Sequence, residues 1–92
     1  MRDADPAADA VLLSRITRNP EIYGGKPIIR GHRMAVEHIL GMMSAGDSPQ
    51  TLLDFYDWLE LEDIQACILY ALRLVEKEHD ESRRAAIGTR SA

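Results

Sequence analysis

The fold of this chain is decided by the stretch GGKPIIRGHRMAV, residues 24–36. The first four residues of the stretch have loop composition, and residues 28–29 and 32–36 are two candidate short strands. Arg30 and Gly31 lie between these strands, where a glycine accommodates the positive φ of a tight turn. Upstream, residues 15–18 alternate in polarity and end at the turn signal Asn19-Pro20. The sequence therefore predicts a small β-hairpin region near the N-terminus.

After this stretch the hydrophobic period becomes helical. One face of the first expected helix carries Val36, Ile39, Leu40 and Met43. We expect this helix to end at Gly46, where a left-handed cap is natural. A second, short helix is expected to begin with Ser48 as N-cap and Pro49 at its first position, and to stop near Asp57-Trp58. Its expected core residues are Leu52, Phe55 and Tyr56.

The start of the third expected helix is acidic, which is favourable at the positive end of a helix dipole. The acidic residues are Glu60, Glu62 and Asp63, and the expected core stripe is Ile64, Cys67, Ile68, Ala71 and Val75. Together these elements predict a mainly α protein, with a short N-terminal β-hairpin followed by a three-helix bundle.

The chain has 92 residues, which is enough for one small domain. We expect residues 1–12 and 78–92 to be flexible tails, because neither shows a hydrophobic period, and residues 13–77 to be the ordered domain. A single cysteine excludes an intrachain disulfide. The sequence shows no signal peptide and no apolar run of membrane-spanning length, so we expect a cytoplasmic protein without membrane contact.

The third helix is apolar nearly all round, because only Gln65 and Arg73 interrupt residues 64–75. A helix of this kind is buried on both sides, and a small domain has too few residues to cover it. We expect a partner interface, in a homodimer or with a different chain, at Ala66, Leu69, Tyr70 and Leu72. The alternative is that the hairpin and the tails cover this face.

The net charge of −4 is unevenly distributed. Residues 15–33 hold five cations against Glu21 alone, and residues 47–63 hold six acids without a cation. The cations are candidates for phosphate or DNA contact: Arg15, Arg18, Lys26, Arg30 and Arg33. The alternative is a solvated hairpin edge that its charges protect from mispairing.

The run from Ile16 to Val36, with its Gly-Gly-x-Pro-x-Ile-x-Gly-x-Arg spacing, resembles the opening signature of the domain-of-unknown-function 433 family. The resemblance spans residues 14–75 and extends to Ala45-Gly46-Asp47-Ser48-Pro49 and Leu61-Glu62-Asp63-Ile64. It implies a homeodomain-like helix-turn-helix bundle and a VapB-type antitoxin, encoded beside a PIN-like ribonuclease toxin. The chain departs from the family pattern at His32, Ala35 and Asp57.

The resemblance and the charges agree only in part. A helix-turn-helix presents the start of its recognition helix to base edges, and here Glu60, Glu62 and Asp63 would be repelled by phosphates. If the protein binds operator DNA, we therefore expect the hairpin cations to make the contact and the helices to act as a scaffold.

We expect no enzyme activity, cofactor or metal site. No nucleophile and base have a recognisable local signature, and Cys67 falls on the apolar stripe, as an unreactive core thiol does. Two functions remain. The first is a dimeric antitoxin that binds its toxin through the third helix and the C-terminal segment and represses its own operon. The alternative is a dimeric protein-interaction module that does not bind DNA.

Overall fold

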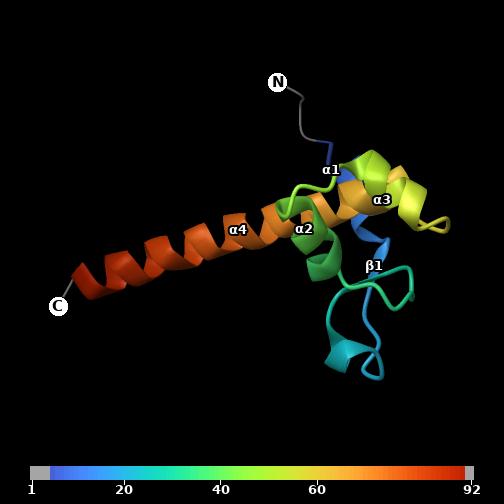
Figure 1. Ribbon diagram of the computed structural model, residues 1–92. Coiled ribbons are helices and arrows are strands. Elements are labelled where there is room, and N and C mark those ends of the chain that lie inside the picture. Colours follow the sequence, from blue (N-terminus) through green and yellow to red (C-terminus); the bar gives the residue numbers. More distant parts are fainter. Residues whose placement is uncertain (1–4, 91–92) are drawn as a thin grey trace.

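The computed structural model describes residues 5–90 and has four α-helices and one two-stranded sheet in that range (Figure 1). In chain order the elements are α1 (Pro6–Leu13), β1 (Ile16–Thr17), the 3₁₀ turn η1 (Tyr23–Gly25), β2 (Ile28–Ile29), α2 (Val36–Ser44), α3 (Pro49–Phe55) and α4 (Leu61–Arg90). The predicted architecture, mainly α with an N-terminal hairpin, is confirmed.

The hairpin pairs differently from the expectation. β1 and β2 are antiparallel, with Ile16 opposite Ile29, whereas residues 32–36 contribute only one bridge, between Ile28 and Ala35. The tight turn itself is present, because Arg30 and Gly31 have φ values of 44° and 73°. β2 thus lies between two neighbours, and both of its side chains are fully buried.

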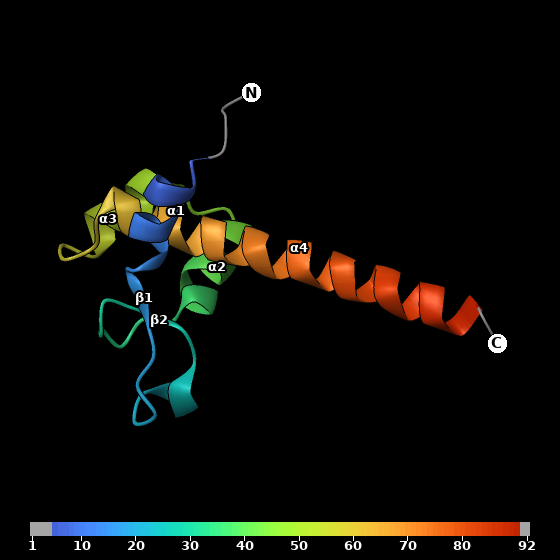
Figure 2. The ribbon, with the colours of Figure 1, turned by 180° about the vertical axis from the view of Figure 1, so that it is seen from behind.

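Residues 6–13 form a helix instead of a flexible tail. The carboxylate of Asp5 accepts hydrogen bonds from the backbone N–H groups of Ala7 and Ala8, and Pro6 occupies the first turn. Asp9 pairs with Arg73 at 2.6 Å, which ties α1 to α4 (Figure 2). The cap and this packing give order to a segment without a strong hydrophobic period. Residues 1–4 of the expected tail lie outside the described residues.

The expected C-terminal tail, residues 78–92, is also helical as far as residue 90. α4 continues without a break from the globular part to Arg90, well beyond the boundary expected at residue 77, and only residues 91–92 lie outside the description. This projection makes the molecule elongated (Figures 1 and 2). The radius of gyration is 15.9 Å, against about 12 Å for a compact domain of this length. No helix in the described range is long and apolar enough to cross a membrane.

The helix signals between Val36 and Pro49 are confirmed. Gly46 follows α2 with a φ of 111°, and Ser48 caps α3 by accepting a hydrogen bond from the Thr51 amide. α3 ends at Phe55, slightly earlier than expected.

The core lies where α2, α3 and α4 meet the hairpin. The main cluster of buried side chains comprises Ile29, Val36, Ile39, Leu52, Leu59, Ile64 and Cys67. Three residues that were expected in the core are on the surface, since Phe55, Ile68 and Val75 are 77%, 46% and 62% exposed. The predicted stripe on α4 is therefore confirmed at Ile64 and Cys67 and wrong at Ile68 and Val75.

Candidate functional site

The carboxylate of Asp63 is fully buried and is held by two arginines from the hairpin region. Oδ1 accepts hydrogen bonds from Arg15 Nη1 at 3.0 Å and from Arg30 Nε at 2.9 Å. Oδ2 accepts from Arg30 Nη2 at 2.8 Å, so that Arg30 binds the carboxylate in a bidentate fork. No polar side-chain atom in the described core is buried without a partner.

Backbone groups complete this cluster. Asp63 Oδ2 also accepts from the amide of Glu60, which makes Asp63 the cap of the first turn of α4. Arg30 reaches Asp63 from a left-handed backbone conformation, and its Nη2 also donates to the carbonyl oxygen of Trp58 at 2.9 Å. Arg15 adds a hydrogen bond of 2.7 Å to the Glu60 side chain. One carboxylate thus joins the residue before β1, the turn after β2, the α3–α4 connection and the start of α4.

The hydrogen bonds set the ionisation of Asp63. Burial acts to raise the pKa of this carboxyl, but the hydrogen bonds from Arg30, the Glu60 amide and Arg15 outweigh burial and lower the pKa below its ordinary value of 3.8. Asp63 is therefore an anion at neutral pH, and the two guanidinium groups are its counter-ions.

This cluster changes the predicted phosphate surface. Arg15 and Arg30 are engaged by Asp63, so they do not form a free basic patch with the other three cations. Lys26 pairs with the exposed Glu37 at 2.7 Å, and Arg18 donates to neutral groups, the Gly25 carbonyl and the Tyr70 hydroxyl. Arg33 is exposed and forms no ion pair with any described residue.

A stacked aromatic pair, which the sequence analysis did not identify, lies beside the cluster. The rings of His32 and Trp58 are parallel within 8°, with centroids 4.0 Å apart, and the guanidinium of Arg30 lies 5.8 Å from the Trp58 ring. From the sequence, His32 stood out only as a departure from the family pattern, and Trp58 only as a residue near the expected end of the second helix. Stacking across the junction between the hairpin and the α3–α4 connection was not predictable from their separation in the chain.

The predicted partner interface on α4 is only partly free. Ala66 is fully buried within its own chain, Leu69 and Tyr70 are half-buried, and Leu72 is exposed. Ala66 is therefore a core residue of its own chain rather than a free contact residue, on a helix that packs against α1, α2 and α3. The free face instead carries four apolar residues that are 45–62% exposed: Leu61, Ile68, Leu72 and Val75. They are seven, four and three residues apart, which places them on one side of the helix. We call these four residues the α4 stripe.

A scan against protein-family models matches residues 16–71 to the family described as "Protein of unknown function (DUF433)". The chain belongs to the DUF433 family. The match covers the hairpin, α2, α3 and the first part of α4, and therefore includes the Asp63 cluster.

Two other proteins are similar to this chain. The DUF433 chain is 33% identical over 73 residues to the uncharacterized protein y4eO of Sinorhizobium fredii, covering 77% of this chain and 33% of the relative. It thus spans about a third of the length of that curated relative. A crystal structure of a DUF433 member from Anabaena variabilis is similar, with a TM-score of 0.64, 27% identity and coverage of 82% of this chain and 76% of that chain.

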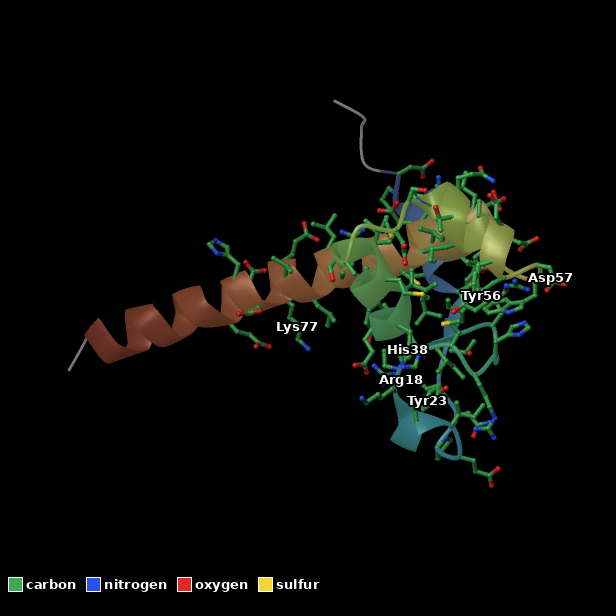
Figure 3. All side chains as sticks on the ribbon, viewed as in Figure 1. Arg18, Tyr23, His38, Tyr56, Asp57 and Lys77 are labelled. Atoms are coloured by element: carbon green, nitrogen blue, oxygen red, sulfur yellow. The ribbon has the colours of Figure 1, made fainter. Side chains whose placement is uncertain are left out.

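The remaining titratable groups of this DUF433 chain include one buried thiol. Burial raises the pKa of the Cys67 thiol to about 12, and the nearby Asp63 anion acts in the same direction. No group of three or more His, Cys, Asp or Glu side chains in the described range is arranged to hold a metal ion. A hollow of about 630 Å³ opens between Tyr23, His38 and Tyr56 and has both acidic and basic groups on its lining (Figure 3).

The Asp63 cluster predicts how stability depends on acid. Because folding lowers the pKa of Asp63, its contribution is complete above about pH 4, near the unfolded value, and is lost as the pH falls through the folded value. Asp63→Asn is expected to reduce the free energy of unfolding at pH 7 by about 3 kcal/mol, since it removes the buried carboxylate that both arginines share and leaves them only the half-exposed Glu60. The free energy of unfolding of this variant should also decline less steeply below pH 4 than that of wild type. Urea unfolding at pH 7, 5, 4 and 3 measures both effects.

The matched control is Glu62→Gln, an exposed carboxylate in the same helical turn. It should change the free energy of unfolding by less than about 0.5 kcal/mol. A decline below pH 4 that is equally steep in the Asp63→Asn variant would contradict this role.

The burial of Cys67 predicts an unreactive thiol. At pH 8 the native protein should react with a disulfide reagent such as Ellman's reagent far more slowly than the protein unfolded in urea, by at least a hundredfold, because the attacking thiolate is both scarce and covered. Similar rates in the two states would show that the core around Cys67 opens readily.

Proposed function

We propose that this DUF433 protein is an antitoxin that binds and neutralises a PIN-like ribonuclease toxin through the α4 stripe. The observation that carries the proposal is the exposure of four large apolar side chains on one side of a helix that extends beyond the globular part (Figure 1). The antitoxin role comes from the sequence resemblance, and the stripe supplies the surface that such a role requires.

The dimensions of the stripe suit helix-in-groove recognition. From Leu61 to Val75 there are 14 helical steps, which correspond to about 21 Å along the axis. Covering four half-exposed aliphatic side chains contributes roughly 1 kcal/mol each. Spacings of three, four and seven residues are those by which an amphipathic helix enters an apolar groove. A toxin with such a groove would bury the stripe without disturbing the core of the antitoxin.

Repression of its own operon by DNA binding is the second part of the proposal. Arg15 and Arg30 are engaged by a buried carboxylate, so DNA contact would depend on Lys26 and Arg33, with Arg18 beside Tyr70. Lys26 and Arg33 are exposed, and the Lys26–Glu37 pair is accessible to solvent and weak in salt.

The alternative is a protein-interaction module that does not bind DNA. The engagement of two of the five predicted cations by Asp63 favours it, because few free charges are then left for phosphates. Both versions require a partner at the α4 stripe, and they differ only in the role of the hairpin loops.

The first test uses the product of a PIN-like reading frame adjacent to the gene. Ile68→Asp and Leu72→Asp should each weaken the binding of the antitoxin to this toxin at least a hundredfold, because each would bury an unpaired charge in the contact. The toxin should then regain its ribonuclease activity. Isothermal titration and an RNA-cleavage assay measure the two effects. Val11→Asp is the control, since Val11 is an exposed apolar residue on α1 and not part of the stripe. The antitoxin proposal fails if no such reading frame exists or if all three variants bind alike.

The second test separates the two versions. If the protein represses its operon, a gel shift with the promoter DNA should show binding that weakens steeply between 50 and 200 mM salt and is lost in the Lys26→Ala/Arg33→Ala double variant. These substitutions lie outside the core, so the fold remains intact. The absence of a shift at 10 µM wild-type protein would leave the interaction module as the function.

A further inference from the structure

A groove separate from the α4 stripe runs between α1, β1 and α4. It has a volume of about 290 Å³, and its lining includes the apolar side chains of Leu13, Ile16 and Leu74. Tyr70 adds its ring, with its hydroxyl held by Arg18 at 2.7 Å. Leu72 of the stripe and Leu74 of the groove are about 200° apart around the helix. The groove therefore lies on another side of α4, and both surfaces are accessible at once.

The rim of this groove is basic. Arg73 is neutralised by Asp9 at 2.6 Å and by Glu76 at 3.2 Å. Arg18 donates only to the neutral Gly25 carbonyl and Tyr70 hydroxyl, and Lys77 forms no ion pair with any described residue. Two cations beside an apolar floor thus remain without counter-ions. This combination fits an apolar side chain that is flanked by carboxylates.

The same chain presents such a feature on its surface. Phe55, the last residue of α3, is 77% exposed, the highest value among the described large apolar residues. Asp54 precedes it and accepts a hydrogen bond only from the Gln50 amide, and Asp57 follows two residues later. Neither carboxylate has a cationic partner in the described part of the chain. We call Asp54, Phe55 and Asp57 the acidic knob.

The knob cannot enter the groove of its own molecule. Figure 3 shows Asp57 at one end of the globular part and Lys77 on α4 beyond the opposite end. Any contact between knob and groove must therefore join two molecules. The partition of charge in the sequence, with acids over residues 47–63 and cations around the groove, is the pattern that directs one copy onto another.

We propose that a second copy of this chain binds in the groove, with Phe55 of one molecule against Leu13, Ile16 and Leu74 of the next. Asp54 and Asp57 then lie against Arg18 and Lys77, so that the charges set the orientation and the aromatic ring supplies the apolar contact. The contact joins two different surfaces. It closes into a dimer if it forms twice about a two-fold axis, and otherwise it propagates into a longer chain. The proposal is independent of the antitoxin function, because it concerns the protein alone.

The experiment uses two complementary variants of the full chain. Phe55→Ser removes the knob and leaves the groove, and Leu74→Glu blocks the groove and leaves the knob. Both positions are largely exposed, so both variants should retain the wild-type circular dichroism spectrum. In sedimentation velocity at 10 to 500 µM, wild type should associate, whereas each variant alone should remain monomeric. An equimolar mixture of the two should form a dimer, because it contains one intact knob and one intact groove.

Charge is tested in the same assay. The Asp54→Lys/Asp57→Lys double variant should self-associate at least tenfold more weakly than wild type, because its knob is then cationic like the rim of the groove. Salt at 0.5 M should weaken the self-association of wild type, because it screens the charges on the rim and the knob. Val11→Ser, an exposed apolar change outside both surfaces, should leave association unchanged.

The proposal is overturned by any of three results. These are a wild-type chain that is monomeric at 500 µM, a single variant that associates as wild type does, and a mixture that stays monomeric. The second result would indicate knob-to-knob or groove-to-groove pairing, since in each of those modes one of the two variants keeps the surface that it needs.

Discussion

The fold depends on one buried anion. Asp63 lies in the first turn of α4, where its carboxylate caps the helix, and burying it is unfavourable unless both oxygens are satisfied. Arg15 and Arg30 satisfy them from two sides of the hairpin, and Arg30 does so from a left-handed backbone conformation that the turn after β2 provides. The two-residue strands would give little stability alone. The ion cluster attaches them to the helical core.

The helical part of this fold was predictable from the sequence because its signals are local. The period from Val36 to Met43, the glycine at position 46 and the Ser48-Pro49 start each act within one or two turns, and each is confirmed. The partner of β2 was not predictable, because a ladder of two residues on each side carries too little pattern to distinguish Ile16–Thr17 from residues 32–36.

The candidate site was harder to predict because burial depends on elements that are distant in the chain. Asp63 belongs to a run of acidic residues, and nothing in the sequence separates it from the exposed Glu62. Assigning residues 1–12 to a tail also removed α1 from consideration. α1 packs on α4, and in the folded chain Ala66 belongs to the core while Ile68 lies on the surface. α4 does expose apolar side chains, as predicted, but apart from Leu72 they are not the residues that were predicted.

The stacking of His32 on Trp58 gives the molecule an internal optical reporter. Trp58 is the only tryptophan of the chain, and its ring stacks on the His32 imidazole of the hairpin turn and lies 5.8 Å from the guanidinium of Arg30, which binds Asp63. The emission of this indole therefore reports on one place, the junction of the hairpin with α4. If the hairpin separated from α4, the fluorescence spectrum of Trp58 would change. This separation can be followed with unlabelled protein.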